Sequence, residues 1–561
     1  MFRTHFRVVC FLLAVVMMAS CQSTPDHTKY IPKDASLVVG LNTTSLGKKI
    51  AWNAFWGSRL LDELKKKVDK SDMMKDMEKT GIKTLTTYYA YMKTDARYDD
   101  GKKFFAVIPL DDAAKWETYL KTLAPDSKIT TQKDRKEALV HNAIYAAWTN
   151  EVLIISNVIY EARKNAFENI DYNDSAAIAK ATQQMSEQAK VDEAATAMEM
   201  DKVFTTASDQ NINAQKSFTA LTKEGHDIAV WVNYESLAGD YVNPAVTGGL
   251  TISNTLWKGA AMAMGFDFEK GKIGGVIHHY IAEEMIGSCD DFGKQNVDKE
   301  LISRLPADGL NMLAGWNIAP NGVKKMTDKL ELTGLINAGL STMNMNFSDI
   351  LDAFNGSMGL ALTHFATTTK TVPANTMYDG QEAFNTTDAD IDFTFAAKVG
   401  KKEALDKLLN FAVAENILHP AGTDKYFIPK EADTTYVSVS DGYIIASNSQ
   451  QHLQDYAIKK AAGSQSDASL SALSHPMGVF FDVKSIVEKM QLTDTANARY
   501  ISLTKNLLSN ISLSGGENHK NTFEYTISVD FVNKEENSLI QLIDFASKLQ
   551  NAGEVKALAA K

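Results

Sequence analysis

Two adjacent histidines, His278 and His279, lie in a run of residues that predicts a strand, and neighbouring imidazoles are a natural first place to look for a metal site. Successive side chains of a strand point to opposite faces of the sheet, so these two rings cannot easily share one ion. The sequence contains neither a Cys-x-x-Cys motif nor a His-Glu-x-x-His motif, the common signatures of zinc sites. The pair therefore favours a structural or solvated role, and we predict no metal site and no cofactor.

A second metal-like pattern is formed by Asp388, Asp390 and Asp392, which have the spacing of the first three ligands of an EF-hand calcium loop. The sixth position of such a loop needs Gly for its sharp turn, and here it is Phe393. The twelfth position needs a bidentate Glu, and here it is Val399. These departures exclude an EF-hand and leave a looser surface calcium site as the alternative.

The sequence shows no recognisable catalytic nucleophile. Cys289 has no evident histidine partner, and a Gly-x-Ser-x-Gly turn is absent. Residues 291–293 match the Asp-Phe-Gly tripeptide of kinases, but no phosphate loop or catalytic loop accompanies them, so the match is a chance one. A carboxylate pair spaced for glycoside hydrolysis cannot be recognised without distances. We therefore expect no catalytic residues and no enzyme.

The N-terminus has the pattern of a secretory signal. Arg3 and Arg7 precede an apolar run over residues 8–18, which is too short to span a membrane. The run ends in small residues before Cys21, which resembles the lipobox of bacterial lipoproteins, with Met18 in place of the usual Leu. The resemblance implies a signal peptide over 1–20, lipid attachment at Cys21 and a polar tether over 21–29.

The residues after the anchor bear on location. Gln22 stands where an Asp would hold some lipoproteins at the inner membrane, and no dense acidic run follows Cys21. We therefore expect an outer-membrane lipoprotein of the cell envelope that faces the periplasm. Its predicted partner is the membrane, through several acyl chains on Cys21, since one chain alone anchors only marginally.

Composition narrows the other partners. The formal charge of −11 becomes −13 when Arg3 and Arg7 leave with the signal, which argues against nucleic acid and against electrostatic binding to anionic lipid. Of three cysteines, Cys10 leaves with the signal and Cys21 is the anchor, so only Cys289 remains and the core must hold the fold without a disulfide. The 25 Phe, 19 Tyr and 21 Met residues suit either a large core or a lipid-lined cavity.

The elements that would position any site fall into two similar series. Residues 30–42 and 305–317 both read as a proline turn, an acidic residue, an apolar strand and a final Asn. After each come helical segments, strands and a hairpin in the same order. The predicted strands are 85–93, 103–108, 143–148, 152–156, 227–233, 260–269 and 272–280 in the first series, and 310–317, 358–363, 390–397, 436–440, 443–448, 508–513 and 522–531 in the second. Residues 475–486 match residues 226–237, the stretch that contains the 227–233 strand.

Helical spacing follows the same plan. Trp116, Tyr119, Leu120 and Leu123 recur at the spacing of one helix face, with Asp111 or Asp112 as a cap, and the 400–412 segment repeats this pattern. The first series carries an extra Ala-rich helical stretch within 175–223. Trp52, Phe55 and Trp56 form a further stripe that we expect to be core, with an exposed binding stripe as the alternative.

Because strands meet in hairpins and strict strand–helix alternation is absent, we predict an α+β fold of two tandem, duplicated modules of antiparallel sheet packed against helices. The modules span 30–290 and 300–550. The lipobox, the opening over residues 30–35, and Asn42 and Ser45 resemble an uncharacterised lipoprotein family known from gut bacteria of the Bacteroidota type and catalogued as domain of unknown function 4836. That resemblance implies a cell-envelope lipoprotein and supplies no activity.

The leading functional hypothesis is therefore a membrane-anchored, non-enzymatic binding or structural module whose protein, glycan or lipid ligand is unknown. One alternative is an envelope hydrolase of glycan or peptide with an Asp/Glu site that sequence cannot reveal. Another is a carrier of an apolar ligand.

Overall fold

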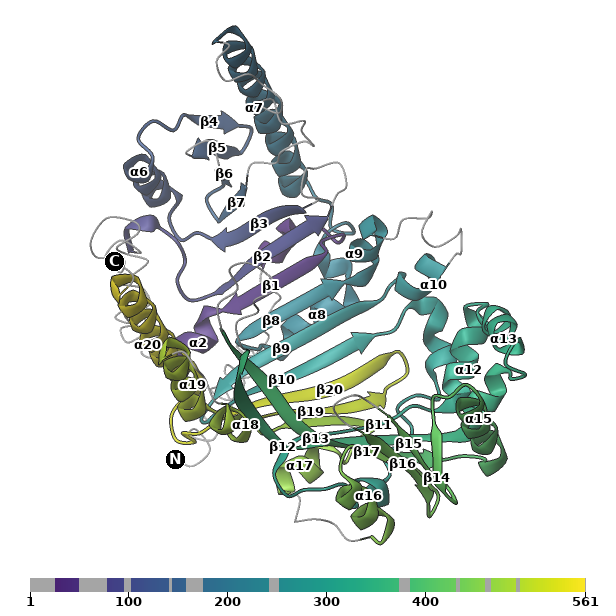
Figure 1. Ribbon diagram of the computed structural model, residues 1–561. Helices are drawn as coiled ribbons and strands as arrows, with labels where there is room; N and C mark the ends of the chain where they lie inside the picture. The colour runs from purple at the N-terminus through teal and green to yellow at the C-terminus, as the bar shows by residue number, and fades with distance from the viewer. Residues whose placement is uncertain are drawn as a thin grey trace, which may run out of the picture. The chain divides into compact units, whose positions relative to one another are not determined.

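A computed structural model of the chain describes residues 26–49, 78–94, 102–140, 144–157, 175–241, 252–372, 384–429, 434–459, 466–490 and 495–559 (Figure 1). These residues form two compact units. Unit 1 lies within 26–253 and takes in Ala261–Gly265, and unit 2 comprises Asn254–Ala260 and the residues from Phe266 onward. The predicted signal over 1–20, the anchor Cys21 and the stripe from Trp52 to Trp56 lie outside the described residues.

Unit 1 contains an antiparallel sheet whose strands pair in the order β4–β5–β6–β7–β3–β2–β1–β8. Alternating burial along β3, in which every second side chain is buried, is the pattern of strands that cover a core on one face. The strands are β1 (Leu37–Asn42), β2 (Thr87–Thr94), β3 (Lys102–Pro109), β4 (Ile129–Gln132), β5 (Arg135–Val140), β6 (Ile144–Trp148), β7 (Val152–Asn157) and β8 (Ile228–Asn233).

Helix α6 (Ala113–Leu123) covers the β5–β7 part of this sheet. Asp112 caps it by accepting hydrogen bonds from two backbone N–H groups, as the sequence predicts. Trp116 and Leu120 pack against Trp148 and Leu153 in one buried cluster. The remaining helices of unit 1 are η1 (Asp26–Tyr30), α2 (Thr43–Lys49), α7 (Ser175–Phe204), η2 (Ile212–Ala214), α8 (Lys216–Glu224) and α9 (Tyr234–Tyr241).

Two elements, α10 (Ile252–Trp257) and β9 (Ala261–Glu269), belong partly to each unit, since the chain passes from unit 1 to unit 2 after Ser253 and again after Gly265. In unit 2 the strands pair, all antiparallel, in the order β14–β15–β16–β17–β13–β12–β11–β18–β19–β20–β10. They are β10 (Lys272–Tyr280), β11 (Leu310–Asn317), β12 (Phe354–Val372), β13 (Phe384–Val399), β14 (His419–Gly422), β15 (Lys425–Ile428), β16 (Thr435–Ser440), β17 (Tyr443–Ser447), β18 (Met477–Phe481), β19 (Leu508–Asn518) and β20 (Thr522–Phe531).

The core of unit 2 joins short helices to the middle of its sheet. Leu301, Leu313, Ile445 and Tyr456 come from four different elements and are fully or almost fully buried together. The helices of this unit are η3 (Glu283–Cys289), α11 (Lys299–Ser303), α12 (Pro320–Lys329), α13 (Thr333–Ser341), α14 (Phe347–Ala353), α15 (Lys402–Ala414), α16 (Gln450–Ala457), α17 (Asp467–Ala472), α18 (Val483–Lys489), α19 (Thr495–Leu507) and α20 (Ser538–Ala559).

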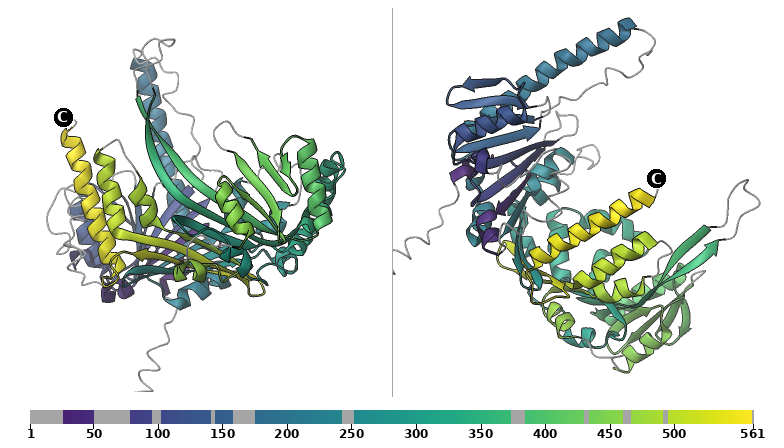
Figure 2. Two further views of the ribbon diagram at one scale, coloured as in Figure 1. Left: turned by 60° about the horizontal axis from the view of Figure 1, so that its bottom comes forward. Right: turned by 90° about the vertical axis from the view of Figure 1, so that its left-hand side faces the viewer.

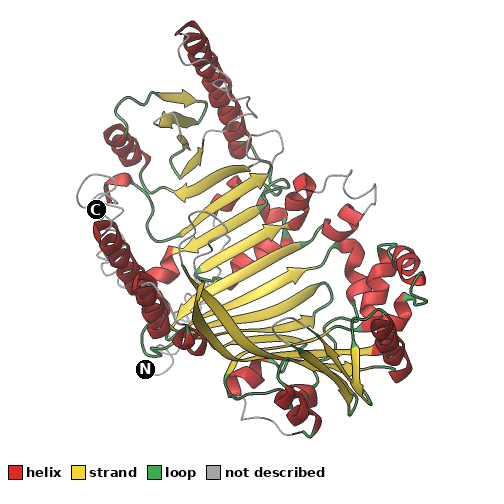
Figure 3. Ribbon diagram, in the orientation of Figure 1, coloured by secondary structure: helices red, strands yellow, loops and turns green. Residues whose placement is uncertain are grey.

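Helices and antiparallel strands together make the chain α+β, as predicted (Figure 3). Strands β11–β18 pair in the same relative order as β1–β8. Strands β4, β5, β14 and β15 were not predicted, and only the inner parts of β12 and β13 were. Strands β12 and β13 pair with each other and form the long curved hairpin seen in Figure 2. The expected helix over 175–223 is three separate elements: α7 ends at Phe204, the short helix η2 is capped by the side chain of Asn211, and α8 begins at Lys216.

Candidate functional site

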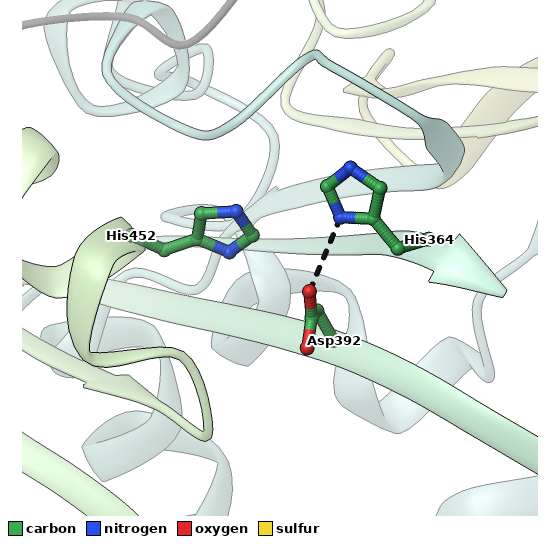
Figure 4. A group of neighbouring side chains, drawn as sticks. All are labelled: His364, Asp392 and His452. Carbon is green, nitrogen blue, oxygen red and sulfur yellow. Dashed lines mark hydrogen bonds and ion pairs between the residues drawn. The ribbon is translucent and has the colours of Figure 1, made fainter.

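Three side chains from three elements of unit 2 converge on one place: His364 on β12, Asp392 on β13 and His452 on α16 (Figure 4). One potential ligand atom from each lies within 4.8 Å of the other two. In Figure 4 the two imidazole rings and the carboxylate point toward one another. The burial ranges from an exposed His364 to a buried His452, so the cluster sits where the core meets solvent.

Asp392 is fixed by the residues on either side of it. The backbone N–H of Phe393 donates to Asn448 Oδ1 at 2.8 Å, and Asn448 Nδ2 donates to the carbonyl of Ile391 at 2.9 Å. Asn448 follows β17 and comes just before α16. One amide side chain therefore joins the backbone around Asp392 to the start of the helix that carries His452.

His364 reaches Asp392 because β12 contains a bulge. Thr363 is opposite Asp392 and Ala366 is opposite Asp390, so His364 and Phe365 together oppose a single residue of β13. In a regular ladder Thr363 alone would share the face of Asp392. Instead His364 adopts a left-handed backbone with φ 54°, and its Nδ1 lies 3.1 Å from Asp392 Oδ2. Such a conformation costs about 1–3 kcal/mol in a non-glycine residue and is concentrated at functional sites.

The neighbouring strand holds this bulge open. The carbonyl of Gly309 accepts a hydrogen bond from the His364 backbone N–H at 2.9 Å, and Asn311 Oδ1 accepts one from Phe365 at 2.7 Å. A Cβ atom on Gly309 would lie 2.6 Å from His364 Cδ2, and Gly309 has a φ of +62°. Only glycine leaves room for the imidazole there. Asp308 Oδ2 lies 3.8 Å from the second ring nitrogen of His364, Nε2.

His452 is placed by its helix. Ser449 caps α16 by accepting a hydrogen bond from the His452 backbone N–H, and Leu453 and Tyr456 bury the helix in the core. Tyr456 lies one turn after His452, and its hydroxyl donates to the carbonyl of Leu301 at 3.3 Å. His452 is only 8% exposed, and its Nδ1 is buried without a hydrogen-bond partner among the described residues. An unsatisfied buried polar atom costs about 1–3 kcal/mol.

Burial lowers the pKa of His452, and the nearby His364 acts in the same direction, although Asp392 opposes the shift. The ring is therefore neutral at pH 7 and presents a lone pair. A neutral imidazole, a second imidazole and a carboxylate can hold a cation, and His364 paired with Asp392 can accept a proton. The geometry permits both uses.

The sites singled out by sequence behave as follows. His278 and His279 lie on β10, where the ring of His278 is near that of Tyr280 two residues on, as expected for side chains that alternate between faces. Asp388, Asp390 and Asp392 lie on a strand and not in a loop, and of these only Asp392 belongs to the cluster. Cys289 is buried, and its pKa is raised by burial and by Asp290.

Sequence reasoning missed His364 and His452. The two residues are far apart in the chain, and neither belongs to a motif. The signals that could have found them are indirect: the asparagine that closes the 443–448 strand, and the glycine after Asp308 at the start of the second series.

Unit 1 has a cavity of about 540 Å³ that is lined by Glu137, Tyr145, Glu193 and residues of the 124–130 segment. Glu137 is almost fully buried, and both its carboxylate oxygens accept hydrogen bonds, from Arg135 Nε at 2.6 Å and from the Tyr145 hydroxyl at 2.6 Å. Burial and the bond to Glu137 raise the pKa of Tyr145. The carboxylate is thus held as a structural acceptor.

The chain has only weak similarity to known proteins. No known family and no curated protein sequence matches the chain. Solved crystal forms of TP0453 are similar over 45–47% of this chain and 79–81% of theirs, with 6–7% identity and TM-scores of 0.24–0.25. These values are too low to carry an argument about fold or function. Among the described helices, none is both long and apolar enough to cross a bilayer.

Proposed function

We propose that this chain is a cell-envelope lipoprotein, anchored through lipid on Cys21, that works as a non-enzymatic binding or structural module built from two copies of one unit. The observation that carries the proposal is the repeated scaffold. The eight strands β1–β8 and the eight strands β11–β18 share one pairing order, and all the pairs are antiparallel.

The two copies also share hydrogen bonds that are not part of the ladders. Asn157 Oδ1 accepts from the Phe104 backbone N–H at 3.0 Å, as Asn448 Oδ1 does from Phe393. The carbonyl of Ser36 accepts from the N–H of Asn233 at 2.9 Å, and Asn311 accepts from Asp482 at the same distance in the second unit. One side-chain hydrogen bond and one backbone hydrogen bond thus recur at equal topological positions, which supports duplication of one module.

The Glu137 carboxylate that lines the cavity of unit 1 is held by hydrogen bonds, and this favours binding over catalysis at that cavity. Both oxygens of the Glu137 carboxylate accept hydrogen bonds, one from Arg135 and one from Tyr145, which supports a structural role for this carboxylate. The polar lining of its cavity, with Asp126, Lys128 and Glu193, gives less support to the alternative of an apolar-ligand carrier.

The anchor can be tested by fractionation in a bacterial host. The full-length chain is expected in the outer-membrane fraction and in the detergent phase of a Triton X-114 partition, and it should incorporate a labelled fatty acid. The Cys21→Ser variant should be absent from both and should lose the label. Labelling that persists in Cys21→Ser would contradict the anchor without bearing on the fold.

The binding role can be tested on the mature chain with Cys21→Ser, purified from envelope extracts and measured by native mass spectrometry. A mass increment of a lipid, glycan or protein would give the ligand class. A turnover of peptidoglycan or glycan fragments by the same preparation would overturn the non-enzymatic assignment.

One observation favours the second candidate, an envelope hydrolase. His364 pairs with Asp392 at 3.1 Å on a partly exposed surface, and such a pair can act as a general base. If hydrolysis is observed, His364→Gln should abolish it. Activity that survives this substitution would remove the cluster from the reaction.

A further inference from the structure

The cluster in unit 2 has a property that the proposed function does not use. His452 is more than nine-tenths buried, yet its Nδ1 has no hydrogen-bond partner among the residues described. Its ring is directed at His364 and Asp392 (Figure 4). A buried ring nitrogen without a hydrogen-bond partner is unfavourable, and here it belongs to a ring that faces a carboxylate and a second imidazole, which a bound cation would satisfy.

We propose that His364, Asp392 and His452 bind one divalent first-row transition-metal ion of the Zn²⁺ class. Two imidazole nitrogens and one carboxylate oxygen are a donor set that Zn²⁺ and its neighbours prefer. Calcium and magnesium require mostly oxygen ligands, and one carboxylate beside two imidazoles does not supply them.

The groups around the cluster suit this ion. With Nδ1 of His364 facing Asp392, its other ring nitrogen, Nε2, lies 3.8 Å from Asp308 Oδ2. A ligating histidine usually donates its other ring N–H to a carboxylate, which fixes the tautomer and makes the ligand more basic. Asp308 occupies that outer position and is not counted as a ligand.

The spacing shows what binding would change. Ligand atoms around a tetrahedral zinc ion lie about 3.3 Å apart, whereas those of the cluster lie within 4.8 Å of one another. Small side-chain rotations must therefore close the site. Because the ligands come from β12, β13 and α16, the bound ion would connect the long hairpin to the helix.

Among the described residues of unit 1 there is no equivalent cluster. Lys103 directly precedes Phe104 as Asp392 precedes Phe393, and these two phenylalanines donate to the equivalent residues Asn157 and Asn448. At the position of Asp392, unit 1 thus carries a lysine, which pairs with Glu199. If the duplication holds, we expect one ion for each chain.

The test uses the mature chain with Cys21→Ser, stripped by a chelator and titrated with ZnCl₂ by calorimetry. The chain with all three site residues unchanged should bind one Zn²⁺ ion, and the same chain loaded with Co²⁺ should show the visible absorption of a four-coordinate ion. His452→Gln, His364→Gln and Asp392→Asn should each weaken Zn²⁺ binding at least tenfold. Circular dichroism shows whether each variant is folded, and the exposed His364→Gln is the variant least dependent on core packing.

Matched controls come from other histidines of unit 2. His475 lies 2.6 Å from Glu517, and His278 and His519 flank Glu524 at 3.8 and 3.6 Å. His475→Gln and His519→Gln should leave affinity and stoichiometry unchanged. The proposal is overturned if folded wild type binds no Zn²⁺, if CaCl₂ binds more tightly than ZnCl₂, or if His519→Gln abolishes binding while His452→Gln and His364→Gln do not. Zinc binding of a chain that proves not to be lipidated would leave this inference standing and remove the anchor.

Discussion

Lys103 Nζ lies 3.3 Å from Glu199 Oε2, and both side chains are almost completely buried. Lys103 is on β3, and Glu199 is near the end of α7, the long helix that belongs to the extra segment of unit 1. Asp201, two residues after Glu199 in the same helix, forms a second ion pair with Arg135, in which Oδ1 lies 2.9 Å from Nη1. Helix α7, which extends beyond the strands in Figure 2, is therefore held at one end by two ion pairs as well as by the buried side chains of Met200 and Val203.

Glu199→Gln should release this end of α7. The substitution removes the negative charge of Glu199 from beside the buried Lys103 ammonium, and breaking a buried ion pair in this way costs about 3–5 kcal/mol. Hydrogen exchange measured by mass spectrometry should show loss of protection over residues 192–204. The matched control is the double variant Lys103→Met with Glu199→Leu, which removes both charges and should recover most of the protection. Equal protection in wild type and Glu199→Gln would contradict the role of the pair.

Acid should loosen the same helix. Burial acts to raise the pKa of Glu199, but the hydrogen bond from Lys202 and the charge of Lys103 outweigh it, so the pKa lies below its ordinary value of 4.5. A carboxylate with a lowered folded pKa stabilises the fold above its unfolded pKa, and that stability is lost as pH falls through the folded pKa. Protection of α7 should hold from pH 7 to about pH 5 and decline below about pH 4.5.

The charge-free double variant should show a smaller decline over this pH range. It would not remove the decline completely, because the hydrogen bond from Arg135 also lowers the pKa of Asp201. An identical pH profile in wild type and in the double variant would show that Glu199 does not contribute.

Most strands could be predicted because apolar alternation and turn residues are local signals. The hairpins at 143–156 and 436–448 and the strand at 310–317 lie where the sequence places them. Strands β4 and β14 could not be predicted in this way, since β4 is mostly polar and β14 contains Pro420 and Gly422. Their pairing to β5 and β15 is set by the tertiary context and not by local propensity.

The candidate site could not be predicted from the sequence for a different reason. Strand alternation from Thr363 would put His364 on the face opposite Asp392, and only the bulge reverses this. The bulge depends on the backbone of Gly309 and on the side chain of Asn311, both from another strand. Information of this kind lies in contacts between residues distant in the chain.

Gly309→Ala should damage the cluster without touching a ligand. The added Cβ would lie 2.6 Å from His364 Cδ2 and would require a left-handed backbone, so we expect a loss of about 1 kcal/mol or more in unfolding free energy and weaker Zn²⁺ binding. Gly334→Ala is the matched control, because nothing lies within 4 Å of its added Cβ and it is on helix α13. There alanine should be neutral or stabilising by about 0.5–1 kcal/mol. Denaturant unfolding and calorimetry measure both effects, and unchanged zinc affinity in Gly309→Ala would separate the glycine from the site.

Asn448→Ala should separate positioning from stability, because unit 1 offers its counterpart. The substitution removes the hydrogen bonds to the backbone groups of Phe393 and Ile391 on either side of Asp392. A buried backbone group left without a hydrogen bond lowers the free energy of unfolding by about 1–3 kcal/mol. Asn157→Ala removes the equivalent bond to Phe104 in the other unit. Both variants should lose stability in denaturant unfolding, but only Asn448→Ala should weaken Zn²⁺ binding, since only that asparagine joins an Asp to the helix of His452. A zinc affinity of Asn448→Ala equal to that of wild type would mean that Asp392 is positioned without Asn448, whereas a matching loss in both variants would point to general destabilisation.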